Sequence, residues 1–162
     1  LIDLAAAGGH SVIVDLLRKI GVKNKNPLHV AAGLGDVKKV KAFINDGRDV
    51  NERDSFGATP LLIATVSGQE EVVDFLLSRK ANPKISATDG YTLMHGAAFS
   101  GKKSMVNKAL SLGLGVNARY GDDGITPTDV AEDEGDALPY LRALGGRTAW
   151  ELGREPPSVP KK

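Results

Sequence analysis

A regular period of small residues constrains the fold of this chain more than any other feature of its sequence. An alanine and, four positions later, a glycine recur at steps of 33, 33 and 34 residues: Ala31, Ala64, Ala97 and Ala131 with Gly35, Gly68, Gly101 and Gly135. An earlier and irregular copy, with Ala5 and Gly9, precedes the next by only 26 residues. A fixed period of this length is typical of stacked repeats, so we expect five copies, the first of them incomplete.

Each copy begins with residues that favour the start of a short helix. Thr59, Thr92 and Thr126 can accept a hydrogen bond from a free backbone N–H. Pro60 and Pro127 follow at the first helical position, where no N–H donor is needed. The recurring alanines let neighbouring copies approach closely, and the recurring glycines suit the left-handed residue that ends such a helix. In the most regular copy we expect this helix over 61–67.

A second helix is expected after each recurring glycine. Val72, Phe75 and Leu76 lie at helical spacing within 71–78, which predicts a helix with one apolar face. One helix pair cannot cover that face by itself, so the pairs must stack. Between pairs, Asp54 and Gly57 favour a tight reversal, which predicts a projecting hairpin, or finger, that leads to the next pair.

These residues make the chain resemble the ankyrin repeat family. The pattern of that family is a Thr-Pro-Leu-His helix start, Gly-His between helices and Gly-Ala-Asp-Val-Asn before the hairpin. The matching pieces are Pro27-Leu28-His29-Val30-Ala31-Ala32, Thr59-Pro60-Leu61-Leu62, Thr92-Leu93-Met94-His95, Gly9-His10 and Gly47-Arg48-Asp49-Val50-Asn51. The chain departs from the pattern at Leu62 and Asp129, which replace the histidine, and at Lys80, which replaces a glycine. It also has one added residue before Gly124.

The resemblance implies an all-α fold, an ankyrin-repeat solenoid of stacked helix-turn-helix pairs joined by β-hairpin fingers. We expect a single domain over 1–152, followed by an extended tail over 153–162. Within the domain, the expected repeats are about 1–26, 27–58, 59–91, 92–125 and 126–146, followed by a short capping helix over 147–152.

Both ends of the array are expected to be irregular. Pro139 falls inside the second helix of the last copy, while Trp150 and Leu152 are expected to cover the end of the stack. Pro27 follows Gly21 by six positions, whereas Pro60 follows Gly47 by thirteen. Either this first finger is short or the sequence lacks a mobile loop there. The chain opens without methionine and inside a repeat, so we expect it to be a fragment of a longer protein.

Composition argues against several classes of function. The net charge is +1 and the pI about 8.1, whereas a nucleic-acid-binding domain typically has a basic face and a pI above about 9, so no nucleic-acid partner is predicted. No apolar stretch approaches the roughly 18 residues of a membrane span, so membrane binding is not predicted either. The chain has no cysteine for disulfides or thiolate metal ligands. The compartment stays open, with the cytoplasm as a default.

No catalytic, cofactor or metal site is predicted. His10, His29 and His95 lie in different copies at positions where the ring is expected to hydrogen-bond the backbone of a neighbouring loop. The acidic residues of 122–124 and 132–136 lack the alternating register and closing glutamate of a calcium loop. The sequence contains no glycine-rich phosphate loop after a strand and no apparent Ser-His-Asp set, so the chain is not predicted to be an enzyme.

The resemblance implies a protein-binding function, because ankyrin arrays are overwhelmingly protein-binding scaffolds. We predict a monomer that binds a protein partner through a concave face of finger tips and inner helices. The alternative is a structural or regulatory segment that packs on another domain of a larger protein. The repeat register predicts the partner-binding residues Arg53, Phe56, Val66, Tyr91, Phe99, Arg119, Tyr120 and Ile125. Aromatic and arginine residues often anchor interfaces, but packing of each finger's aromatic on the next finger is the competing interpretation.

Overall fold

The computed structural model describes residues 8, 10, 12, 13, 16, 25–131 and 135–153. Within them the chain forms the helices α3 (Pro27–Gly33), α4 (Val37–Asn45), α5 (Pro60–Val66), α6 (Glu70–Ser78), α7 (Leu93–Phe99), α8 (Lys103–Ser111), α9 (Pro127–Val130), α10 (Ala137–Ala143) and α11 (Ala149–Gly153). The only β pairing of these residues is an isolated antiparallel bridge between Tyr120 and Ile125. The predicted all-α repeat fold is confirmed. The expected first repeat lies almost entirely outside the described residues.

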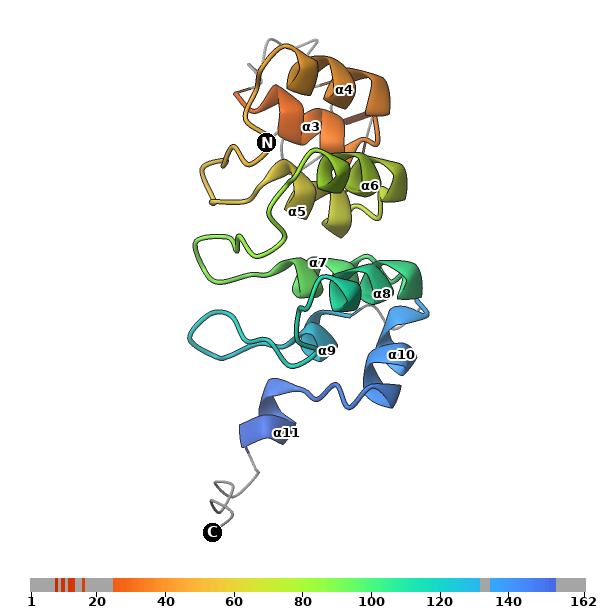
Figure 1. Ribbon diagram of the computed structural model, residues 1–162. Coiled ribbons are helices and arrows are strands. Elements are labelled where there is room, and N and C mark those ends of the chain that lie inside the picture. Colours follow the sequence, from red (N-terminus) through yellow and green to blue (C-terminus); the bar gives the residue numbers. More distant parts are fainter. Residues whose placement is uncertain are drawn as a thin grey trace.

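The helices form two layers along one elongated stack (Figure 1). Helices α3, α5, α7 and α9 pack on one another in succession and form the inner layer, while α4, α6, α8 and α10 form the outer layer beside it (Figure 1). Three connections, 46–59, 79–92 and 112–126, project on the same side of the stack and are the fingers (Figure 1). Backbone hydrogen bonds of 2.9 Å link successive fingers, from Thr88 to Phe56 and from Gly121 to Asp89.

The predicted threonines begin the inner helices. Thr59 caps α5 through its side chain, and both α5 and α9 carry the expected proline at the first helical position. Thr92 and Thr126 form reciprocal capping boxes with His95 and Asp129, which accept from the threonine N–H groups at 3.2 and 2.9 Å. Such caps satisfy the N–H groups that a helix start leaves free. Asp129 therefore performs the capping role of the histidine that it replaces.

The recurring glycines end helices for the expected reason at three of four positions. Gly35, Gly68 and Gly101 have φ angles of 71°, 65° and 69°, in the left-handed region that favours glycine. Lys80, which replaces a glycine, keeps this conformation with a φ of 65°, at a cost of about 1–2 kcal/mol. Gly135 is needed for a different reason: a side chain at this position would clash with the backbone of Gly101, because its Cβ would lie 2.6 Å from the Gly101 Cα.

Apolar residues of successive pairs form one continuous core. Leu28, Leu61 and Leu93 occupy the same place in three inner helices, and each is 0–3% exposed. Ala31, Ala64 and Ala97 of the same three helices are equally buried and let the inner helices approach one another, whereas Ala131 is half-buried. Since burying a side chain of leucine size contributes about 1.5–3 kcal/mol, the stacking of pairs provides stabilisation that a single pair lacks.

The last pair is shorter than the others. Inner helix α9 has 4 residues against 7 in each of α3, α5 and α7, and outer helix α10 has 7 against 9 in each of α4, α6 and α8. Pro139 lies inside α10 as predicted, but at its third position, where the backbone N–H has no acceptor within the helix. The proline is therefore tolerated, and α10 packs on α7 and α8 through buried Ala137 and Leu141.

Helix α11 repeats the start of an inner helix. Thr148 Oγ1 accepts from the Glu151 N–H at 3.2 Å, and Glu151 accepts from the Thr148 N–H at 2.6 Å, as in the cap of α9. Trp150 holds the place that buried Leu61 has in α5, yet its side chain is 65% exposed. This exposure does not support the prediction that Trp150 covers the end of the stack, which stays a prediction. Leu152 is half-buried.

Candidate functional site

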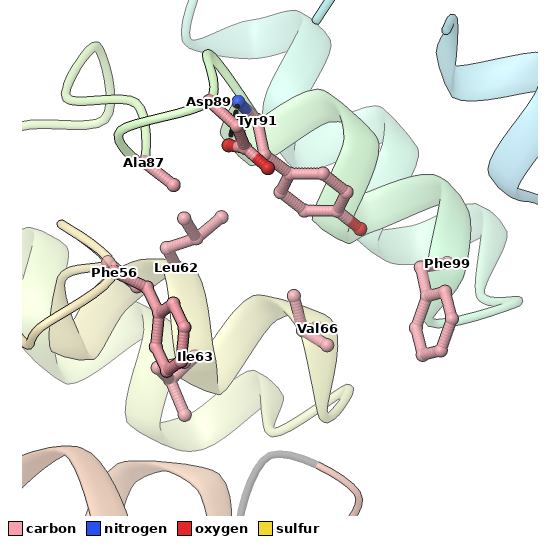
Figure 2. A pocket seen from close by; sticks show the side chains of 9 residues that line it. Phe56, Leu62, Ile63, Val66, Ala87, Asp89, Tyr91 and Phe99 are labelled. Atoms are coloured by element: carbon pink, nitrogen blue, oxygen red, sulfur yellow. Dashed lines mark hydrogen bonds between the residues drawn. The ribbon is translucent and has the colours of Figure 1, made fainter. Parts of the chain in front are cut away.

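An apolar pocket of about 300 Å³ lies between the repeats of α5 and α7, on the side of the fingers. Its walls are Phe56, Ala58, Leu62, Ile63, Val66, Ala87, Asp89, Tyr91 and Phe99. In Figure 2, Leu62 points from α5 toward Ala87 of the next finger, and Val66 lies farther along α5, on the side of Phe99. Phe56 and Phe99 flank the pocket and are 63% and 42% exposed. Large apolar side chains thus surround a hollow that is open to solvent.

One cause of the pocket is a leucine in place of a histidine. His29 of α3 and His95 of α7 donate from Nε2 to a carbonyl of the following finger, at 3.0 and 3.1 Å, which confirms the role predicted for these rings. Leu62 holds the same position in α5 and cannot donate to the corresponding carbonyl, that of Tyr91. The wall between α5 and its following finger is therefore apolar where the neighbouring repeats have a polar bridge.

A second cause is an alanine in place of an aspartate. Asp54 begins the turn of its finger, and its Oδ1 accepts from two N–H groups of that turn, both at 2.9 Å. Ala87 holds this position in the next finger and has no polar side chain. There, Oδ1 of Asp89 accepts from the Tyr91 N–H at 2.9 Å instead. The exposed Asp89 consequently contributes the one charged side chain of the pocket wall.

Behind the pocket, three rings pack together. Tyr120 lies edge-on to His95 and Tyr91, with ring centroids 4.8 and 4.9 Å apart, and Tyr91 is tilted against His95 at 5.3 Å. Burial lowers the pKa of His95 and raises the pKa of Tyr91 and of Tyr120. All three rings are therefore neutral near pH 7, as a packed cluster requires.

The structure divides the eight predicted binding residues into two groups. Phe56, Val66, Tyr91 and Phe99 meet at the pocket. The sequence analysis did not predict the other wall residues, which are Ala58, Leu62, Ile63, Ala87 and Asp89. The departure at Leu62 was a usable signal, because a lost polar bridge leaves an apolar surface in its place.

The other four predicted residues have partners within the fold. Arg53 donates to the backbone carbonyls of Gly57 and Ser86, both at 3.0 Å, and so ties one finger to the next. Arg119 donates to a carbonyl of its own finger at 3.3 Å. Tyr120 and Ile125 exchange backbone hydrogen bonds of 3.0 and 2.9 Å. These contacts favour the packing interpretation for the four, and a binding role for them stays a prediction.

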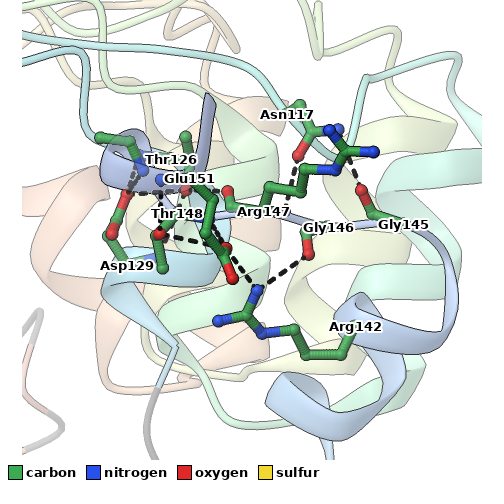
Figure 3. A network of polar contacts seen from close by, with 10 residues as sticks. Asn117, Thr126, Asp129, Arg142, Gly145, Gly146, Arg147, Thr148 and Glu151 are labelled. Carbon is green, nitrogen blue, oxygen red and sulfur yellow. Dashed lines mark hydrogen bonds and ion pairs between the residues drawn. The ribbon is translucent and has the colours of Figure 1, made fainter. Parts of the chain in front are cut away.

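A polar network attaches α11 to the last pair (Figure 3). Glu151 accepts from the Thr148 N–H and, at 2.5 Å, from Arg142, and these contacts lower its pKa to about 2. Burial would raise the pKa of Asp129, but hydrogen bonds, first that from the Thr126 N–H, outweigh it and lower the pKa. The acidic groups of this network have donors within the chain, so its role is structural.

The described part of the chain offers neither a metal site nor a membrane-spanning helix. Residues 25–131 and 135–153 contain no group of three or more side chains suited to hold a metal ion. None of the helices in these ranges has the length and apolar character needed to cross a bilayer. The pocket beside α5 is therefore the candidate site.

The sequence matches a family model described as ankyrin repeats (3 copies) over residues 2–87. The chain belongs to the ankyrin repeat family. The matched range includes α3 to α6 and reaches into the finger that carries Ala87. Ankyrin repeats generally mediate protein–protein interaction, and the family is typically non-catalytic. This family function agrees with a candidate site made of apolar wall rather than reactive groups.

Relatives of this ankyrin chain are much longer proteins. It is 29% identical over 155 residues to the transient receptor potential cation channel subfamily A member 1 homolog of Caenorhabditis elegans, which covers 91% of the chain. It is 33% identical to alpha-latrocrustotoxin-Lt1a of Latrodectus tredecimguttatus over 134 residues, which are 82% of the chain. It is 37% identical to the inactive serine/threonine-protein kinase TEX14 of Bos taurus over 86 residues, which are 53% of the chain. The chain spans 13%, 9% and 6% of their lengths, respectively.

Proposed function

We propose that this ankyrin array is a non-enzymatic scaffold that binds a protein partner on a concave face of finger tips and inner helices. The observation that carries the proposal is the apolar pocket between two repeats, flanked by exposed Phe56 and Phe99. Contiguous exposed apolar side chains often mark interaction sites, and aromatic residues are frequent anchors of interfaces. A net charge of +1 gives no support to nucleic acid as the partner.

Site-specific photo-crosslinking tests this function. A photoreactive phenylalanine analogue replaces Phe56 or Phe99 beside the pocket, or, as the matched control, Lys38, which is exposed on outer helix α4. After irradiation in a cell extract, we expect discrete protein adducts from the two pocket positions, competed by unlabelled protein, and none from position 38. Adducts of equal strength from position 38, or from that position alone, would contradict binding on the proposed face.

A second candidate function is a structural or regulatory role within a longer protein. It is favoured by the small share of each relative that the chain covers, between 6% and 33% for the first four. The same face would then bind a neighbouring domain of its own polypeptide, and the isolated array would be a monomer. Crosslinking in the longer protein separates the two, because adducts within one polypeptide favour the second function and adducts with another protein favour the first.

A further inference from the structure

We infer that the pocket beside α5 takes one bulky apolar side chain of an extended partner segment, and that a lysine or arginine close to it in that segment pairs with Asp89. This inference rests on the protein-binding function proposed above and adds the chemistry of the bound segment. It follows from the size of the pocket, from its single charge and from the sequence changes that form it.

The size of the pocket fits a side chain. Its volume of about 300 Å³ lies at the lower end of the range of about 300–1,000 Å³ for small-molecule pockets. The deep wall is Leu62, which is 2% exposed, and Ile63 and Val66 extend this wall along α5. A single leucine, methionine or aromatic side chain can fill such a space, whereas the exposed Phe56 and Phe99 can cover the neighbouring backbone.

The charge of the pocket favours a basic neighbour for that side chain. No cationic side chain of the described residues forms an ion pair with Asp89. Arg53, the cation of the adjacent finger, instead donates to the carbonyls of Gly57 and Ser86. Asp89 is exposed and keeps one carboxylate oxygen beyond the bond to the Tyr91 N–H. A lysine or arginine of the partner segment would supply the missing counter-charge.

Three departures from the repeat pattern coincide at this place. Leu62 replaces the histidine that both neighbouring inner helices carry, and Ala87 replaces the aspartate of the preceding finger. In α7, Gly96 takes the place that Ile63 has in α5, and a Cβ at Gly96 would lie 3.0 Å from the Val66 Cγ2. Leu62 and Ala87 make the wall of the pocket apolar, and Gly96 lets Val66 of α5 pack closely against α7. The neighbouring repeats keep their polar bridges from His29 and His95.

The repeat pattern also provides variants that should fill or polarise the pocket without unfolding the array. Leu62→His restores the ring of the other inner helices, with the Tyr91 carbonyl as acceptor. Ala87→Asp restores the turn residue that Asp54 provides in the preceding finger. Asp89→Asn removes the charge and keeps the acceptor for the Tyr91 N–H. Circular dichroism and urea unfolding verify that each variant folds, and the exposed Asp89→Asn serves if either of the others does not.

The probe is a random peptide library displayed on phage and selected on the wild-type chain. We expect enriched peptides to share a bulky apolar residue within a few positions of lysine or arginine. Their synthetic, fluorescein-labelled forms are then titrated by fluorescence anisotropy. Leu62→His and Ala87→Asp should weaken binding about tenfold or more, the effect of losing an anchor side chain. Asp89→Asn should weaken it about fivefold, and only for peptides that retain the basic residue.

Several outcomes would overturn the inference. They are an acidic or purely polar consensus, no enrichment at all, or peptides that bind Leu62→His as tightly as the wild type. A concentration-dependent dimer in light scattering that Leu62→His dissociates would mean that a second copy occupies the pocket. If Phe56 and Phe99 still crosslink a partner while the library fails, the protein-binding function stands and the segment chemistry is wrong. If the library yields the expected peptides but positions 56 and 99 crosslink no protein in the extract, the chemistry of the pocket stands and the proposed binding of a protein partner is wrong.

Discussion

Tyr120 and Phe56 are both aromatic residues of finger tips, but they have different surroundings. Tyr120 packs edge-on against His95 and Tyr91, whereas Phe56 is largely exposed beside the pocket. We expect Tyr120→Ala to lower the free energy of unfolding by about 1–3 kcal/mol and Phe56→Ala to change it by less than about 0.5 kcal/mol. Urea unfolding followed by circular dichroism measures both. Equal effects would contradict the division of the predicted binding residues into packing and pocket groups.

Gly135 gives a second contrast at this scale. A side chain at Gly135 would meet the backbone of Gly101, whose carbonyl also accepts from the Ala137 N–H at 3.1 Å. We expect Gly135→Ala to lower the free energy of unfolding by about 1–3 kcal/mol, because neither backbone segment can shift without breaking this bond. Gly115→Ala is the matched control, since nothing lies within 4 Å of a Cβ there. Chemical denaturation of the two variants compares them, and equal stability would contradict the close approach.

The sequence predicted the side chains that form caps and bridges, but it did not predict the pocket, which forms where such polar side chains are replaced by apolar ones. The capping threonines and the bridging histidines were predictable, because each needs a specific donor or acceptor at a fixed spacing. The pocket was only half predictable. Phe56 and Phe99 are visible in the sequence as apolar residues at finger and helix-end positions. The apolar wall between them depends on the polar groups that Leu62 and Ala87 lack and on how two repeats meet.

At the scale of the helix, the boundaries followed from capping residues. The helices expected over 61–67 and 71–78 are α5 and α6, and their observed bounds agree within one residue. The prediction for the C-terminal helix was less successful, because apolar residues near a chain segment's end do not specify what they pack against. Helix α11 is held by hydrogen bonds and an ion pair (Figure 3). The Trp150 side chain is largely exposed.

Acid should detach α11 from the stack. The folded pKa of Glu151 is lowered from 4.5 to about 2, so its contribution to stability is present above the unfolded pKa. That contribution is lost as the pH falls from about 4.5 towards 2, when protonation weakens the hydrogen bonds from Thr148 and Arg142. Fluorescence of Trp150, the single tryptophan of the chain, should report the detachment during a pH titration.

The control for this titration removes the titrating group. Glu151→Gln should flatten the fluorescence change over this pH range, with a residual change from Asp129, whose pKa is also lowered. Glu71 is exposed on α6, away from the network, so Glu71→Gln should leave the wild-type curve unchanged. Superimposable curves for Glu151→Gln and the wild type would mean that the network does not hold α11.

At the scale of the whole molecule, each described repeat packs mainly on its neighbours. Helix α5 packs on α3 and α7, and α7 in turn packs on α9, so the main contacts of the described stack are within a repeat or between adjacent repeats. The stability of such a solenoid is approximately a sum of repeat and interface contributions. The pocket lies at one of these interfaces, where Leu62 replaces the histidine that bridges helix and finger in the neighbouring repeats.

This arrangement predicts how the stack unfolds when one repeat is weakened. Leu76 of α6 and Leu141 of α10 are both fully buried, and replacing either by alanine should cost about 2–5 kcal/mol. Leu76 lies in the middle of the stack, so Leu76→Ala should lower the urea midpoints of circular dichroism and of Trp150 fluorescence together. Leu141 lies in the last pair, so Leu141→Ala should lower the fluorescence midpoint more than that of circular dichroism, because the terminal repeat can unfold while the others stay stacked. Coincident midpoints in Leu141→Ala would mean that the array unfolds as one unit despite its nearest-neighbour contacts.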